Sequence, residues 1–247
     1  MAKAAKPGEQ TVMIEVEICA STIRDVAVAM EAGAGRVELC SVWSVGGITP
    51  NVVVVEAAAS MGMPVRALIR PREGSFVHST SERSWASEEA KVMMDCGAER
   101  VVVGGLDASG GLDEAYLESL VEAVGSESLV WHRAIDASET PERDVDTLLK
   151  FGVTSILSSG GAIRAVDGLA RIESLVAKGM QVVAGGGVRP EDVPRLAAAG
   201  VEAVHASCRV PTSGPTSSLF DTTVHGVDYD KACDLVDAVE SFNAPES

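Results

Sequence analysis

Apolar and polar residues alternate along short runs rich in Val and Ile, and longer helix-like stretches separate these runs. The alternation is clearest in the first run, where Ile14, Val16 and Ile18 share one parity and Glu15, Glu17 and Cys19 share the other. Such a period of two predicts strands. Eight runs are predicted as strands: Val12–Cys19, Arg36–Cys40, Pro64–Arg70, Arg100–Leu106, Leu129–Asp136, Ser155–Gly160, Gln181–Val188 and Ala203–Val210.

A glycine stands shortly before each of the last seven runs, where a helix would end. These glycines are Gly33, Gly62, Gly97, Gly125, Gly152, Gly179 and Gly200. Glycine is favoured just past a helix end because it enters the left-handed conformation without a Cβ penalty. Strand starts recur about every 22 to 36 residues, the length of a βα unit. Eight units in 247 residues predict a (β/α)8 barrel, the TIM-barrel architecture.

This pattern predicts a single α/β domain over residues 11–247, preceded by a disordered, polar lead-in over residues 1–10. After the eighth strand, Pro211–Val227 is rich in Ser, Thr, Gly and Pro, and we expect a long loop there, as a lid over the barrel mouth. Asp228–Phe242 then predicts a closing helix, with a stripe of apolar residues that ends at Phe242. Active sites of such barrels lie at the C-terminal ends of the strands.

Composition narrows the classes of partner. The formal net charge of −16 and a pI near 4.6 argue against nucleic acid and anionic membranes as partners. No apolar run reaches the roughly 18 residues of a membrane span. The five cysteines are too few and too scattered for a disulfide framework, so we expect a cytoplasmic protein. The acidic surface suits a high-salt cytoplasm or an acidic mesophile. The oligomeric state stays open, a homo-oligomer included.

Strand parity predicts which side chains face the barrel lumen. In the first three strands the apolar parity must face the helices. The lumen would then hold Glu15, Glu17, Cys19, Arg36, Glu38, Cys40, Arg66, Leu68 and Arg70. One interpretation is a structural lattice of ion pairs, which Glu15, Arg36 and Arg66 fit best. The other is a site at the upper end, with Glu17, Glu38 and Arg70 as members that interact there directly or through water.

Candidate acid and base residues come from the upper strand ends. Val130, His132, Ala134 and Asp136 would share one face of the fifth strand, which makes His132 a candidate general base beside Asp136. A lone barrel histidine is more often a core residue, so that alternative stays open. We therefore list Glu17, Glu38, His132 and Asp136 as candidate catalytic residues.

Candidate anion-binding residues cluster at the ends of four strands. Arg70 and Arg72 flank Pro71, and paired arginines at a barrel mouth suit a carboxylate or phosphate. Glycine-rich turns after strands 6 and 7 offer backbone N–H groups, or serve only as tight turns. With the serine hydroxyls and the strand-8 histidine, the remaining candidates are Ser158, Ser159, Gly185, Gly186, Gly187, His205 and Ser207.

Two cysteines end adjacent strands. Thiolates of Cys19 and Cys40 suit a soft ion such as Cu(I), which prefers sulfur ligands. Against this, neighbouring barrel strands contribute to alternate layers, and a free cysteine is commonly a small buried hydrophobe. The other three, Cys96, Cys208 and Cys233, are interpreted as structural.

Segments from every part of the predicted barrel resemble the CutC copper-homeostasis family. They include Glu17–Cys19, Arg36–Cys40, Gly46–Pro50, Ile69–Phe76, His132–Asp136, Leu157–Gly161, Ala184–Val188 and Val204–Ser207. The resemblance spans about residues 12–210. It implies a cytosolic barrel linked to copper, with a Cu(I) site at Cys19 and Cys40. The chain departs from the family pattern at Ala20, Val45, Ser75 and His78.

Two functions therefore stand side by side. The resemblance favours copper homeostasis, with copper(I) held by Cys19 and Cys40. The ion-lined lumen favours an enzyme of lyase, isomerase or hydrolase type that acts on a small phosphorylated or carboxylated metabolite. In both cases the site lies at the C-terminal barrel face, and a small anionic ligand is the expected partner.

Overall fold

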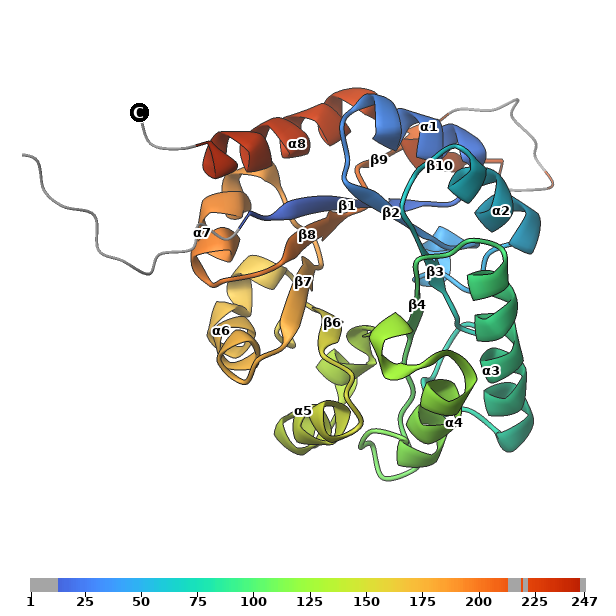
Figure 1. Cartoon of the computed structure of the whole chain (residues 1–247). Helices are drawn as coiled ribbons and strands as arrows, with labels where there is room; N and C mark the ends of the chain where they lie inside the picture. Colours follow the sequence, from blue (N-terminus) through green and yellow to red (C-terminus); the bar gives the residue numbers. More distant parts are fainter. Residues whose placement is uncertain (1–12, 213–218, 220–221, 245–247) are drawn as a thin grey trace, which may run out of the picture.

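Eight parallel strands close into a barrel in chain order, and helices surround it (Figure 1). The structure is a computed structural model that describes residues 13–212, 219 and 222–244. The strands are β1 (Glu15–Ala20), β2 (Arg36–Leu39), β3 (Val65–Leu68), β4 (Arg100–Val103), β5 (Leu129–Trp131), β6 (Ser155–Ser158), β7 (Gln181–Gly185) and β8 (Ala203–Ala206). The predicted (β/α)8 barrel is confirmed. The predicted lead-in over residues 1–10 lies outside the described residues.

The outer ring consists of the helices α1 (Ile23–Glu31), α2 (Val52–Ser60), α3 (Thr80–Asp95), α4 (Glu114–Val124), α5 (Pro141–Lys150), α6 (Leu169–Ala177), α7 (Val193–Ala198) and α8 (Tyr229–Asn243). Side-chain caps set several starts: Thr22 accepts the N–H of Asp25, and Ser79 accepts that of Glu82. All seven glycines that predicted helix ends have positive φ, which glycine adopts without a Cβ penalty, although ψ of 149° takes Gly125 out of the left-handed region. No helix in the described part of the chain has the length and hydrophobicity needed to cross a bilayer.

Two apolar layers lie on the two faces of the barrel sheet. Ile18, Val37 and Val65 belong to the large core between barrel and helices, as strand parity predicted. The opposite parity fills the lumen with a smaller layer: Cys19, Cys40, Leu68, Val102, Val130, Leu157, Val183 and Ala203. This lumen layer separates the two ends of the barrel.

The strands are shorter than the sequence predicts, because several of them give way to turns at their C-terminal ends. The fifth predicted strand stops at Trp131, and a 3-10 helix, η3 (Arg133–Ala137), follows it. The alternation predicted for Ala134 and Asp136 is therefore wrong, since neither lies on a strand. The three other short turns near the site are η1 (Trp43–Val45), η4 (Ala165–Asp167) and η5 (Pro190–Asp192).

The segment after β8 is more ordered at its two ends than the predicted loop. Arg209–Thr212 (β9) and Val224–Val227 (β10) pair as an antiparallel ribbon. Residues 213–218 and 220–221, on which part of the predicted lid falls, lie outside the described residues. The closing helix α8 is confirmed, and it packs beside α1 and α7 to complete the ring (Figure 1). Phe242, however, is 37% exposed rather than buried on its apolar stripe.

Candidate functional site

A cavity of about 740 Å³ opens at the C-terminal ends of the barrel strands. It takes in ten of the residues singled out from the sequence: Cys19, Glu38, Cys40, Arg70, His132, Asp136, Gly186, Gly187, His205 and Ser207. Five others do not line it: Glu17, Arg72, Ser158, Ser159 and Gly185. The sequence therefore located the cavity, but not the role of every residue around it.

Beneath the cavity, Glu17 is the centre of a buried ion-pair network. Its carboxylate lies 2.7 Å from Arg36 Nε, 3.1 Å from Arg66 Nη1 and 2.7 Å from His205 Nδ1. Burial opposes its charge, but the hydrogen bond with His205 and the charges of Arg36 and Arg66 outweigh burial and hold the pKa of Glu17 well below its usual range. Glu17 is therefore an ionised structural carboxylate, which does not suit the proton-transfer role predicted for it.

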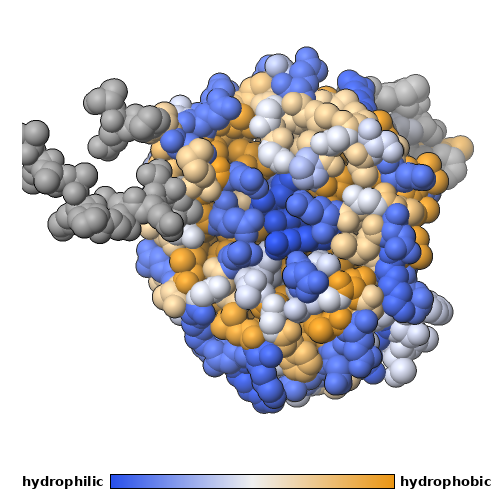
Figure 2. Space-filling model, in the orientation of Figure 1, coloured by the Kyte–Doolittle hydropathy of each residue, from blue (hydrophilic) through white to orange (hydrophobic). Residues whose placement is uncertain are grey.

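The same network reaches the N-terminal end of the barrel. Arg36 also pairs with Glu15, and Glu202 lies 3.2 Å from Arg36 and 3.3 Å from Arg66. Because β–α–β crossovers are right-handed, the clockwise strand order in Figure 1 means that this view looks onto the N-terminal strand ends. In the same orientation Figure 2 shows hydrophilic side chains gathered at the centre of that face. Ion pairs thus close this end of the lumen.

On the cavity side of the network, the thiols of Cys19 and Cys40 face each other. Their sulfur atoms are 3.6 Å apart, although they sit two residues out of step on neighbouring strands. The hydrogen bond between the two thiols is the main reason that the pKa of Cys40 falls to about 7, with help from the Ser21 hydroxyl and the charge of Arg209. The same contact, together with burial, raises the pKa of Cys19. One sulfur of the pair is thus the preferred thiolate.

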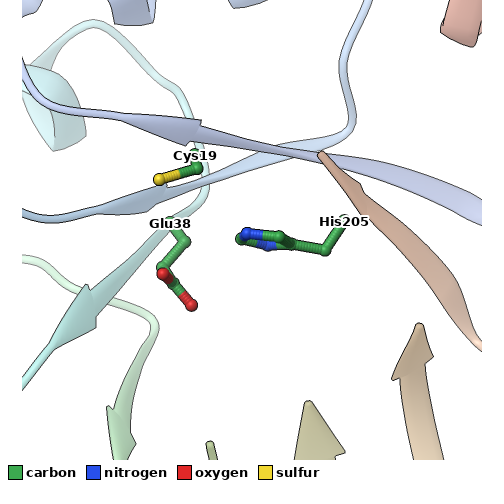
Figure 3. Close-up of side chains that lie close together, drawn as sticks. All are labelled: Cys19, Glu38 and His205. Atoms are coloured by element: carbon green, nitrogen blue, oxygen red, sulfur yellow. The ribbon is translucent and has the colours of Figure 1, made fainter. Parts of the chain in front are cut away.

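A third and a fourth polar group approach the thiols from β2 and β8. Donor atoms of Cys19, Glu38 and His205 lie within 4.8 Å of one another, and Figure 3 shows the three side chains projecting from neighbouring strands into one space. Burial is the main cause that raises the pKa of Glu38 to about 7. Burial would lower the pKa of His205, but the charge of Glu38 and the hydrogen bond with Glu17 raise it. One Glu38 oxygen, Oε2, is buried and has no hydrogen-bond partner among the described residues.

The two arginines after β3 have different environments. Arg70 is 6% exposed, and its guanidinium donates to the carbonyl oxygens of Val45, Gly47 and Gly74 at 2.8–3.0 Å. No hydrogen bond joins it to Glu17 or Glu38 among the described residues, so of the two predicted forms of contact, direct or through water, the direct one is absent. Arg72 turns outward and pairs with Glu82 at 2.5 Å. The structure thus separates the predicted arginine pair.

His132 is a buried, neutral histidine at the end of β5. It is 5% exposed, and its ring lies 5.1 Å from that of Phe76. Burial, assisted by the charge of Arg70, lowers its pKa to about 3. Such an imidazole is too weak a base to take a proton near neutral pH, which does not suit the general-base role predicted for it.

Asp136 organises the loop after β6. Its carboxylate accepts hydrogen bonds from the hydroxyls of Ser158 and Ser159 at 2.6 and 2.9 Å, and from the backbone N–H groups of Ser159 and Gly161 at 3.0 Å. These bonds and Arg133 lower its pKa although burial opposes them. The serines predicted to bind an anion are thus engaged with a protein carboxylate instead.

The strand-7 glycines divide at the cavity edge. Gly186 and Gly187 line the cavity with φ of 124° and 57°, whereas Gly185 packs its Cα against Leu157 and His205. A Cβ at Gly185 would lie 2.6 Å from Leu157. This glycine therefore serves close packing, while the next two bring backbone to the cavity.

Comparisons with known proteins now settle the family. A family model described as the CutC family matches residues 14–210. The chain belongs to the CutC family. A curated CutC family protein of Agrobacterium fabrum is 35% identical over 209 residues, 83% of each chain, and one of Citrobacter koseri is 34% identical over 206 residues, 82% of this chain and 83% of its own. The crystal structure of the putative copper homeostasis protein CutC from Streptococcus agalactiae superposes with a TM-score of 0.74 at 29% identity, covering 79% of this chain and 99% of that chain.

Several residues that line the cavity of this CutC family member were not among the candidates predicted from the sequence. Trp43, Phe76, Arg133 and Ile163 all line the cavity. Phe76 and Arg133 stand inside segments that carried the family resemblance, which was a usable signal. Trp43 lies in η1, 5.4 Å from the ring of His225 on β10, a contact that only the fold brings about.

Proposed function

We propose that this chain binds Cu(I) through the thiolates of Cys19 and Cys40, as part of copper handling. The observation that supports this best is the 3.6 Å separation of the two sulfur atoms. A metal–thiolate bond of about 2.3 Å, the length found for zinc, lets one ion touch two sulfurs up to about 4.6 Å apart. The pair therefore fits one ion without movement of the strands. The name printed for the Streptococcus agalactiae relative, a putative copper homeostasis protein, points the same way.

The chemistry of the donor set also suits a soft cation. Both cysteines are buried at 5% and 2% exposure, and sulfur ligands in such a setting favour Cu(I) over harder ions. The lowered pKa of Cys40 provides one thiolate near neutral pH, and a bound cation would displace the proton of Cys19. His205 and Glu38 stand beside Cys19 as further potential ligands. A reducing cytoplasm is the proposed compartment, in keeping with five free cysteines.

Anaerobic titration with Cu(I) against a competing chelator tests this proposal. We expect about one ion per chain, and its loss in the Cys19→Ser, Cys40→Ser double variant. The matched control is the Cys96→Ser, Cys233→Ser double variant, which removes two half-buried thiols that do not line the cavity and should bind like the parent. Equal binding by the Cys19 and Cys40 double variant and the parent would rule the site out.

A second candidate function rests on the size of the cavity. About 740 Å³ is far more than a metal ion needs and lies within the range of small-molecule sites. Arg70, Gly186 and Gly187 line it together with Glu38 and His132. The second candidate is therefore an enzyme that acts on a small phosphorylated or carboxylated metabolite.

Thermal unfolding with phosphate and simple carboxylates tests this second candidate. A ligand that binds the folded state raises the melting temperature with increasing concentration. Arg70→Lys keeps the positive charge but not the fork of donors, and should reduce the shift. No shift for any of these anions at millimolar concentration would count against the enzyme.

A further inference from the structure

Four side chains that can bind a metal ion come together where β1 lies between β2 and β8. Cys19 on β1 is the direct neighbour of Glu38 on β2, and His205 on β8 is the direct neighbour of Glu17, two residues before Cys19. Ligand atoms of Cys19, Glu38 and His205 lie within 4.8 Å of one another, and Figure 3 shows the three side chains projecting into one space. The fourth, Cys40, has its sulfur 3.6 Å from that of Cys19. All four line the cavity, so an ion can reach them from there.

The distance between the two sulfurs distinguishes between coordination geometries. With metal–sulfur bonds of about 2.3 Å, sulfurs 3.6 Å apart make an angle of about 103° at the ion, close to the tetrahedral angle of about 109°. An ion bound linearly by two thiolates alone would need sulfurs about 4.6 Å apart. Tetrahedral ligand atoms are roughly 3.3–3.8 Å from one another, so shifts of about 1 Å in the side chains of Glu38 and His205 complete the set. The thiol pair is thus spaced for an ion that has two further ligands.

His205 is oriented as a metal ligand. Its Nδ1 lies 2.7 Å from Glu17 Oε1, so Nδ1–H donates to that carboxylate and Nε2 is left for an ion. Metal-bound histidines almost always donate their other N–H to a carboxylate, a carbonyl or water, which fixes the ring. Arg36 and Arg66 in turn hold the Glu17 carboxylate at 2.7 and 3.1 Å. The ion-pair network beneath the cavity therefore orients the histidine.

Glu38 is a buried carboxylate without a counter-charge. It is 6% exposed, and none of the ion pairs between described residues includes it. A cation among the four ligands would supply a counter-charge for this carboxylate and for the thiolates. Zinc accepts thiolate, imidazole and carboxylate ligands in one tetrahedral site, whereas Cu(I) is selected by soft sulfur ligands. The mixed set of ligands therefore favours Zn²⁺.

We propose that Cys19, Cys40, His205 and Glu38 together bind one Zn²⁺ ion in tetrahedral coordination. The proposal rests on the thiol pair of the proposed function, and it adds two ligands and a second ion to that pair. Zn²⁺ and Cu(I) then compete for the same two sulfurs. Only Zn²⁺ depends on the imidazole and the carboxylate, which makes the two proposals separable.

Titration of the reduced, metal-free full chain with Zn²⁺ against a chromophoric chelator tests the site. We expect about one ion per chain. His205→Gln and Glu38→Gln should each weaken Zn²⁺ binding by about tenfold or more, because each removes a ligand, and should leave Cu(I) binding almost unchanged. The matched control is His225→Gln on β10, which does not line the cavity and should bind both ions like the parent. Melting curves of the metal-free variants establish that each is folded.

Co²⁺, bound in place of Zn²⁺, gives a readout that a merely structural role of these residues would not move. The parent should show the intense visible absorption of tetrahedral Co²⁺ and a near-ultraviolet charge-transfer band from the thiolates. The proposal is overturned if the parent binds no Zn²⁺, if Co²⁺ gives the weak absorption of six-coordination, or if both folded ligand variants bind Zn²⁺ like the parent. Cu(I) binding that persists in those cases leaves the proposed function intact. Zn²⁺ binding without Cu(I) binding would reject the copper proposal and keep this one.

Discussion

The two ends of the barrel lumen carry similar kinds of residues in opposite states. At the N-terminal end, Glu17 is surrounded by Arg36, Arg66 and His205, so its charge is matched on all sides. At the C-terminal end, Glu38 and Arg70 are equally buried, but no ion pair between described residues includes either of them. Paired charges hold strands together, whereas a charged side chain beside the cavity that has no counter-charge can be compensated by a ligand. Within one lumen, the N-terminal end therefore serves stability and the C-terminal end serves function.

The largest expected effect comes from removing the central charge of the ion-pair network at the N-terminal end. Glu17→Gln should lower the free energy of unfolding by about 3–5 kcal/mol, because it leaves two buried arginines without their central counter-charge. Urea unfolding measures this. Glu15→Gln is the matched control: the Glu15 side chain is 55% exposed, and its loss should cost less than about 1 kcal/mol. Similar losses in both variants would contradict the distinction between the two ends.

At the C-terminal end, the charge of Glu38 should destabilise the fold. The folded pKa of Glu38 is raised to about 7, above its usual value of about 4.3, so its carboxylate destabilises the fold as the pH rises through this interval. Glu38→Gln should therefore raise the free energy of unfolding by about 2–3 kcal/mol near pH 8. Near pH 3 the Glu38 carboxyl is protonated in the folded and the unfolded chain alike, and the gain should vanish. Unfolding curves at the two pH values check the sign, and a loss near pH 8 would show that Glu38 is paired.

Replacing the two thiols should change the free energy of unfolding less than replacing either carboxylate does. The Cys19→Ser, Cys40→Ser double variant places two hydroxyls next to each other, where they can hydrogen-bond, and we expect a loss of about 1–2 kcal/mol. Its melting temperature should stay close to that of the parent while Cu(I) binding disappears. A variant that unfolds would instead place the thiols among the structural elements of the barrel.

The smallest effect is expected for Arg72. Its pair with Glu82 lies at the surface, with the arginine side chain 39% exposed, so Arg72→Gln should change the free energy of unfolding by less than about 1 kcal/mol. It should also leave the rise in melting temperature with phosphate unchanged, in contrast to Arg70→Lys. A rise in melting temperature that falls equally in the two variants would show that Arg72 reaches the cavity.

Much of the fold was predictable because it depends on local rules. Glycines at helix ends and period-two alternation in strands predict where each element lies. Eight repeats of one βα unit then predict a sheet that closes into a barrel. Parity also assigned Cys19, Glu38, Cys40 and Arg70 correctly to the lumen. The end of the fifth strand was missed, because His132 caps the 3-10 helix η3 with its own side chain, a choice that hydrophobic alternation does not reveal.

The sequence by itself therefore determined the barrel, the inward-facing residues, the end at which a site lies and the resemblance to the CutC family. Only the tertiary structure decided which of those residues are already satisfied. Glu17, Asp136 and Arg72 form ion pairs, whereas no ion pair between described residues includes Glu38 or Arg70. The reason is physical: the direction of a side chain follows from its own strand, but its partners come from other strands, and distances between strands are set only when the barrel closes.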